Sequence, residues 1–79
     1  MPSINAITPR QARAARAVLA MSVRELAQQS DIAESSIRRT EAGLSTLDTR
    51  VRLQDYFAAV GFEFTFLGAG KVGVVWVER

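Results

Sequence analysis

Cysteine and histidine are both absent from this 79-residue chain. Their absence excludes a disulfide framework, a thiol nucleophile and the usual zinc ligands, and it fits a reducing, cytoplasmic environment. No run of residues is long and apolar enough to span a membrane, and the N-terminus lacks a secretory pattern. Because a glycine-rich phosphate loop is also missing, we expect no enzyme, no metal and no cofactor.

Acidic and basic residues nearly balance, with a formal net charge of +2, but they are unevenly distributed. Residues 1–52 contain eight basic and five acidic side chains, a balance of +3, whereas the remainder contains two basic and three acidic ones, a balance of −1. A basic segment of this kind suits a polyanionic partner such as nucleic acid. A GC-rich genome, which favours arginine codons, would produce the same excess.

Capping signals predict the first two helices. Thr8 is a good N-cap and Pro9 suits the first helical position, which predicts a helix that runs to about Ala20. Ser22 followed three residues later by Glu25 forms a capping box for a second helix. Residues 1–7 before them are expected to form a flexible N-terminal arm.

Two further helices are expected at 33–42 and 46–60. Gly43 suits the end of the third helix, and Ser45, three residues before Asp48, is a start signal for the fourth. The expected core residues of the fourth helix are Leu47, Val51, Phe57 and Val60, with Leu53 and Tyr56 on its flank.

The C-terminal segment 62–79 changes to an alternating pattern that predicts a β-hairpin, with a glycine-rich turn at 68–70 and a second strand at 71–78. One face can cover the helices, and the other needs a partner, so we expect a homodimer built on these strands. Alternatively, the aromatic residues are the ordinary core of a monomer. The predicted dimerisation residues are Phe62, Phe64, Phe66, Val74 and Trp76 on one face, with Val75 and Val77 on the other.

Residues 22–43 read as two short helices joined by a tight turn, with packing residues at fixed positions. These are Leu26-Ala27, Ile32, Ile37, Glu41 and Gly43. The pattern resembles the Cro and phage-repressor type of helix-turn-helix, the XRE family. The resemblance implies a mainly α, lambda-repressor-like bundle of four to five helices over residues 8–61, here followed by the hairpin. It also implies a structural ion pair between Arg16 and Glu41.

Three positions depart from the family pattern. Asp31 replaces the usual turn glycine, although aspartate tolerates a left-handed backbone better than most residues. Ala33 replaces the usual hydroxyl cap, at a cost of about 1 kcal/mol. Val23 replaces a glutamine that often contacts phosphate, which removes one expected DNA contact.

The third helix would supply the DNA contacts. By position, Glu34, Ser35 and Arg39 face base edges, and Arg39 can pair with guanine through two hydrogen bonds. Alternatively, Glu34 only favours its helix N-terminus, and the arginines form a solvated basic face. Ser36 and Arg38 would lie near phosphates, with Arg10, Arg13 and Arg24 as flanking phosphate contacts.

The leading functional hypothesis is therefore a sequence-specific DNA-binding transcriptional regulator, a small dimeric repressor or autoregulator that binds a double-stranded operator. The alternative is a helix-turn-helix module that binds protein, either as an antiactivator of a larger regulator or as an antitoxin of a toxin.

Overall fold

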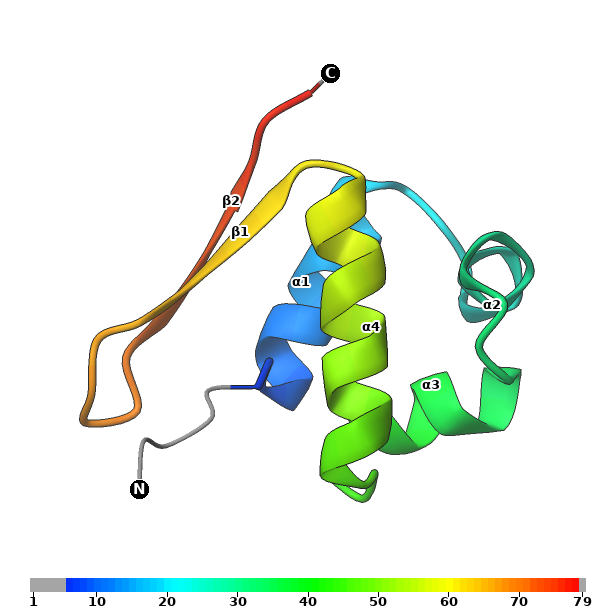
Figure 1. Cartoon of the computed structure of the whole chain (residues 1–79), viewed down its shortest axis with the longest axis horizontal. Coiled ribbons are helices and arrows are strands. Elements are labelled where there is room, and N and C mark those ends of the chain that lie inside the picture. Colours follow the sequence, from blue (N-terminus) through cyan, green and yellow to red (C-terminus); the bar gives the residue numbers. More distant parts are fainter. Residues whose placement is uncertain (1–5, 79) are drawn as a thin grey trace.

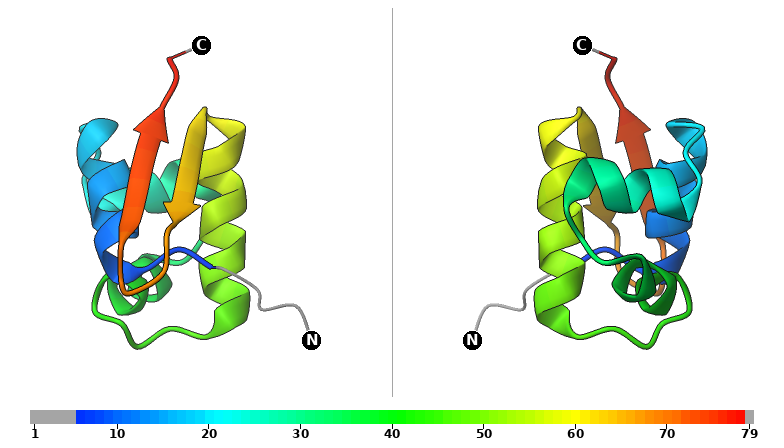
Figure 2. Two further views of the ribbon diagram at one scale, coloured as in Figure 1. Left: turned by 90° about the vertical axis from the view of Figure 1, so that its left-hand side faces the viewer. Right: turned by 90° about the vertical axis from the view of Figure 1, so that its right-hand side faces the viewer.

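The computed structural model describes residues 6–78, which form four helices followed by a two-stranded antiparallel hairpin (Figure 1). The hairpin lies beside α1 and α4, while α2 and α3 lie on the other side of these two helices (Figures 1 and 2). A mainly helical fold with a C-terminal hairpin is thus confirmed. In chain order the elements are α1 (Pro9–Val18), α2 (Val23–Ser30), α3 (Glu34–Glu41), α4 (Leu47–Ala59), β1 (Phe62–Phe66) and β2 (Val72–Trp76).

Two parts of the predicted organisation fall partly outside the described residues. Residues 1–5 of the expected arm are not described, but the last two arm residues, Ala6 and Ile7, are buried. Arg79 at the end of the hairpin segment is likewise not described. From residue 6 to residue 78, no helix combines the length and the apolar character needed to cross a membrane.

The predicted start of α1 is confirmed in detail. The Thr8 hydroxyl accepts a hydrogen bond from the Gln11 backbone N–H at 3.1 Å, and the Gln11 side-chain oxygen accepts one from the Thr8 N–H at 2.9 Å. Thr8 and Gln11 therefore form a reciprocal capping box. The predicted end was two residues late, because α1 stops at Val18 and Ala20 has a left-handed φ of +56°.

The predicted caps of the other three helices are confirmed for α2 and α3 but not for α4. Ser22 and Glu25 form the expected capping box of α2, and Ala33 gives α3 no side-chain cap, as predicted. The start signal of α4 was misplaced by one residue, because Thr46 is the N-cap and its hydroxyl accepts from the Thr49 N–H at 3.3 Å. Ser45 instead has a buried hydroxyl with no hydrogen-bond partner among the described residues.

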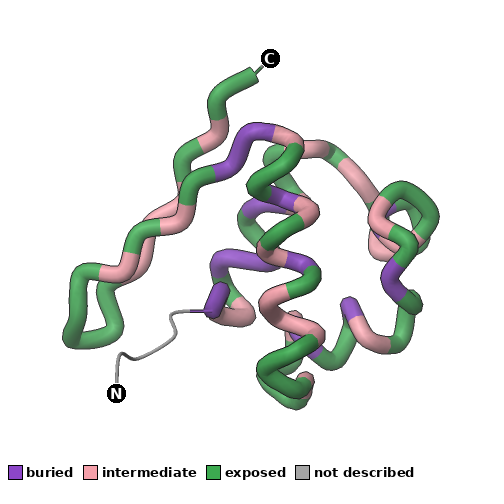
Figure 3. Tube along the Cα trace, viewed as in Figure 1, coloured by how far each residue is buried: buried purple, intermediate pink, exposed green. Residues whose placement is uncertain are grey.

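The core lies between the helices and beneath the hairpin (Figure 3). Two predictions for α4 were wrong: Leu53, expected on the flank, is fully buried, whereas Leu47, expected in the core, is 47% exposed. Phe57 is buried as predicted, and its ring meets that of Phe62 edge-on, with centroids 5.4 Å apart. The fully buried apolar residues are Ile7, Ala12, Ala15, Leu26, Ile37, Leu53 and Phe57.

The hairpin turns its aromatic face toward the helices. Register pairs Phe62 with Trp76 and Phe64 with Val74, and all four side chains belong to the core or pack against it. The Trp76 indole N–H also donates to the backbone carbonyl of Val60 at 3.1 Å. Phe66, the fifth inner residue of the predicted dimer set, is half-buried and shares the face of Phe62 and Phe64 by strand alternation. Of that set only Val75 and Val77 are exposed, at 49% and 54%.

The outer face of the hairpin is less apolar than the valine-rich strand suggested. Glu63 lies opposite Val75 and Thr65 lies opposite Gly73 on this face, so β1 contributes polar side chains to it. Strand β2 is also shorter than the predicted 71–78. The predicted turn at 68–70 is confirmed, with all three residues at positive φ.

A buried amide joins α1 to both strands. Gln11 is only 1% exposed, and its side-chain nitrogen donates to the backbone carbonyls of Thr65 and Gly73 at 3.2 and 2.9 Å. The oxygen of the same side chain accepts from the Thr8 N–H. One residue therefore completes the N-terminal cap of α1 and holds the hairpin against that helix. This role has no local signal in the sequence, since the contacts span 54 and 62 residues.

We predict that Gln11→Ala destabilises the fold by about 2–3 kcal/mol, because it leaves the Thr8 N–H without its acceptor and creates a cavity. Urea unfolding followed by circular dichroism measures the change. Gln28→Ala on the exposed surface of α2 is the matched control and should change stability by less than about 0.5 kcal/mol. Equal stabilities of the two variants would contradict the role given to Gln11.

We predict a pH-dependent contribution from the α2 capping box. Hydrogen bonds from the Ser22 backbone N–H, and secondarily from its hydroxyl, lower the pKa of Glu25 below its ordinary value of 4.5. The folded state therefore holds this proton more weakly than the unfolded state, so the stabilisation is present above pH 4.5 and is lost as pH falls through the lowered pKa.

Glu25→Gln tests this, because glutamine keeps the capping geometry without titrating. The difference in unfolding free energy between wild type and variant should shrink as pH falls below 4.5 and through the lowered pKa of Glu25. A difference that stays constant with pH would show that Glu25 does not titrate with folding.

Candidate nucleic-acid interface

Helices α2 and α3 meet at a steep angle through a three-residue turn (Figure 1). Asp31 begins the turn in the left-handed conformation, with φ +60°, and its N–H donates to the Ala27 carbonyl at 3.0 Å. Ile32 follows and is 5% exposed, so it anchors the turn in the core. The left-handed aspartate and the buried isoleucine were both expected from the sequence, and both are confirmed.

Helix α3 is divided into a buried and an exposed side. Ile37 and Thr40 are fully buried, and the Thr40 hydroxyl donates to the Ser36 carbonyl at 2.9 Å. Ser36 itself is half-buried, so its hydroxyl is less accessible to a phosphate group than the side chains of its exposed neighbours. The exposed side consists of Glu34, Ser35, Arg38 and Arg39, a set that we call the α3 face.

Charges on the α3 face are only partly paired. Arg38 contacts Glu34 one turn earlier, with 3.3 Å between guanidinium nitrogen and carboxylate oxygen. Their side chains are 65% and 45% exposed, so the pair is screened by water and holds Arg38 weakly. Within residues 6–78, Arg39 forms no salt bridge.

The three flanking arginines of the predicted set occupy different environments. Arg24 lines a groove between α2 and α3 that also reaches Glu34. Arg13 donates to the backbone carbonyl of Glu41 and thereby caps the C-terminal end of α3. Arg10 lines a second groove, between α1 and β2. Of the three, Arg24 is thus the one placed in a groove together with a residue of the α3 face.

The ion pair implied by the family resemblance is present. The Arg16 guanidinium meets the Glu41 carboxylate through two hydrogen bonds, of 2.7 and 2.9 Å, and a third nitrogen donates to the Met21 carbonyl at 3.1 Å. The side chains are only 26% and 11% exposed. Hydrogen bonding to Glu41 raises the pKa of Arg16, despite the opposing effect of burial, so this arginine stays charged.

The structure also assigns a positioning role to Arg50 of α4. Its guanidinium donates to the backbone carbonyls of Ile7 and Ala6 at 3.0 and 3.2 Å. Gln54, one turn further along α4, accepts from the Ile7 N–H at 2.9 Å. The sequence pattern does not reveal these contacts, because the partners are more than forty residues apart.

No protein-family model matches the chain, and a comparison with curated proteins found no match. The candidate interface is therefore defined by its geometry. The α3 face offers two guanidinium groups and a hydroxyl, which are donors for base edges and phosphate oxygens, together with one carboxylate acceptor.

We predict unequal coupling in the two ion pairs. A double-mutant cycle on Arg16→Met and Glu41→Gln should give a coupling of about 1–2 kcal/mol, because the pair is bidentate and largely shielded from water. The same cycle on Arg38 and Glu34 should give only about 0.3–0.5 kcal/mol, because both side chains are exposed. Chemical unfolding at moderate salt measures both. A coupling near zero for Arg16 and Glu41 would contradict the structural role of their ion pair.

Proposed function

We propose that this chain is a sequence-specific DNA-binding transcriptional regulator of the Cro and phage-repressor type, with α3 as the helix that enters the major groove. The main support is the division of α3: Ile37 and Thr40 fix it in the core, while the α3 face stays in solvent. A helix held in this way by a preceding helix and turn can enter the groove without rearranging the domain.

The α3 face provides chemistry for both kinds of contact with DNA. Arg39 is exposed and suits two hydrogen bonds to guanine, and Ser35 suits any of several base edges. Arg38 can exchange its weak bond to Glu34 for a phosphate oxygen, since little energy is lost by breaking an exposed pair. Glu34 can then accept from the amino group of cytosine.

The regulator acts, in this proposal, by occupying an operator and excluding RNA polymerase from overlapping promoter DNA. The excess of basic residues in 1–52 would add nonspecific attraction to the phosphates and speed association.

A second candidate is a protein-binding module with the same fold, such as an antiactivator or an antitoxin. The Glu34–Arg38 pair favours it, because this pair offsets one positive charge on the α3 face. Exposed Leu44 and Leu47, 76% and 47% accessible, lie in and after the loop that follows α3 and add an apolar surface.

The test is selection of binding sites from a random pool of duplex DNA, followed by affinity measurements on the enriched site. We predict that Arg39→Ala weakens binding to that site by roughly 5- to 150-fold and relaxes one base position. Arg38→Ala should instead weaken binding to all sequences and reduce the salt dependence by about one ion.

Arg52→Ala on α4 removes the same charge from an exposed position outside α3 and is the control. It should retain the base preference of the wild type. Folded wild-type protein that enriches no sequence would contradict the proposal, and so would an enriched site that Arg39→Ala still reads with unchanged preference. The first result would favour the protein-binding candidate, whereas the second would leave DNA binding in place and contradict the base-reading role given to Arg39.

A further inference from the structure

Strand β2 pairs with β1 along one edge, and its other edge has no strand partner within residues 6–78. The Val77 N–H donates to the Gly61 carbonyl, so this residue pair is hydrogen-bonded. Because bonded and non-bonded pairs alternate in an antiparallel ladder, the backbone groups of Val72, Val74 and Trp76 point away from β1. In the same residues no backbone hydrogen bond outside the ladder uses these groups, so they are available to an added strand.

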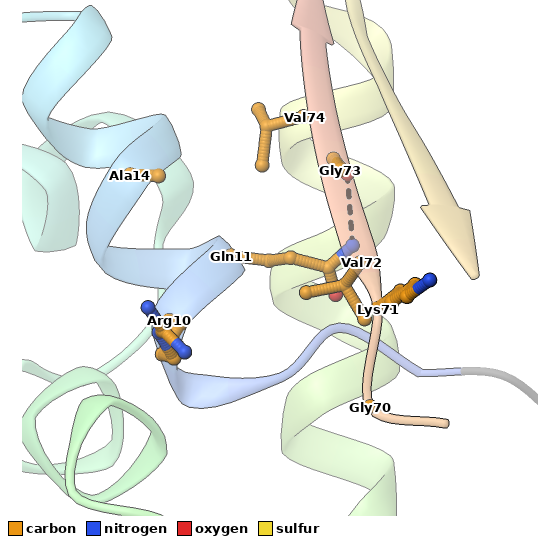
Figure 4. Close-up of a pocket in the computed structure, with 8 residues that line it drawn as sticks. All are labelled: Arg10, Gln11, Ala14, Gly70, Lys71, Val72, Gly73 and Val74. Atoms are coloured by element: carbon orange, nitrogen blue, oxygen red, sulfur yellow. Dashed lines mark hydrogen bonds between the residues drawn. The ribbon is translucent and has the colours of Figure 1, made fainter. Parts of the chain in front are cut away.

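A groove of about 490 Å³ runs between β2 and α1 (Figure 4). On the helix side it is lined by Ala14, which is exposed, and Val18, one turn further along α1, is 47% exposed. On the strand side it is lined by Val72 and Val74, which are half-buried. The walls are thus small and apolar, so an extended segment along β2 would cover apolar side chains with every second residue.

The two ends of the β2 edge differ in charge. Arg10 and Lys71 line the groove where β2 begins, both are exposed, and neither forms a salt bridge among the residues described. Arg10 lies on the α1 side of the groove, whereas the Lys71 side chain points away from α1 (Figure 4). Glu78, which is also exposed, follows the other end of β2. An occupant should therefore carry its negative charge beside the beginning of β2.

We propose that β2 and α1 form a docking site for an extended acidic segment of another protein, which joins the hairpin as a third strand. The segment runs antiparallel to β2, so its C-terminal end lies beside Lys71. Successive residues of a strand point to opposite faces, so two consecutive acidic residues at that end meet Arg10 on one face and Lys71 on the other. Apolar residues at alternate positions before them cover Ala14 and Val18.

Charge distinguishes this occupant from a second copy of the chain. Strand β2 is followed by a single acidic residue, Glu78, and then by the basic Arg79. A second copy would therefore bring one attraction and one repulsion to the two cations, whereas a pair of acidic residues brings two attractions.

The docking site is also separate from the α3 face. The hairpin lies on one side of α1 and α4, and α3 lies on the other (Figures 1 and 2). A segment bound along β2 therefore leaves the α3 face open, so a partner held here does not compete for the surface that the proposed function assigns to DNA.

The experiment is an NMR titration of the isotope-labelled full chain, without DNA, with a synthetic peptide. The probe is acetylated and amidated, and alternates valine and threonine before a C-terminal aspartate–glutamate pair. One control peptide has two lysines in place of that pair, and a second carries the acidic pair at its N-terminal end. The probe should shift the amide signals of Val72, Val74 and Trp76 and should bind at least about fivefold more tightly than either control.

A charge reversal tests the two cations. Arg10→Glu and Lys71→Glu combined in one chain replace two attractions by two repulsions, so the probe should bind about tenfold or more weakly and the lysine peptide should now bind more tightly than the probe. Arg24→Glu, on α2 and far from the hairpin, is the matched control and should keep the preference for the probe (Figure 1). Circular dichroism verifies that both variants are folded.

Three outcomes would overturn the proposal: no shift at up to about 1 mM probe, equal binding of the probe and the lysine peptide, or a preference that the charge reversal leaves unchanged. Self-association that protects the same three amides from hydrogen exchange, and that excess probe does not displace, would also overturn it and make a second copy the occupant. Because no DNA is present, each result is separate from the test of DNA reading.

Discussion

The Arg16 guanidinium is the point at which the two helices of the candidate interface are tied to the rest of the domain. This side chain of α1 donates two hydrogen bonds to the carboxylate of Glu41 at the end of α3 and one to the Met21 carbonyl just before α2. Arg13, one turn earlier, binds the backbone of the same glutamate. The orientation of α3 thus depends on two side chains of α1, and any property of the α3 face depends on them in turn.

A second set of long-range polar contacts fixes the parts of the chain that precede and follow the helices. Arg50 and Gln54 of α4 hold the backbone of residues 6 and 7, and Gln11 of α1 holds the hairpin. These groups bind backbone atoms, which every residue possesses. These contacts fix the main chain of the two segments, and the buried side chains of the same segments complete the core.

Much of the local structure could be predicted from the sequence, because capping and turn residues act on backbone groups within four residues of themselves. Ser22 with Glu25 and the left-handed Asp31 are of this kind. The boundaries of α4 and its core were harder, because apolar residues occur on several sides of that helix and adjacent hydroxyls at 45 and 46 offer competing caps. The roles of Gln11 and Arg50 could not be predicted, since their partners are distant in sequence. The candidate interface was predicted as a set of residues, but the separation of Arg10 and Arg13 from the α3 face required the structure.

The hydrogen bonds of Gln11 also have a kinetic consequence. They close loops of 54 and 62 residues, whereas the turn between α2 and α3 is bridged by contacts within the same short segment. Closing a long loop carries an entropic cost that local contacts avoid, so we expect the helices to form first and the hairpin to dock last. Trp76, which reports on that docking through its packed indole, should then recover its native fluorescence after the helical signal has returned.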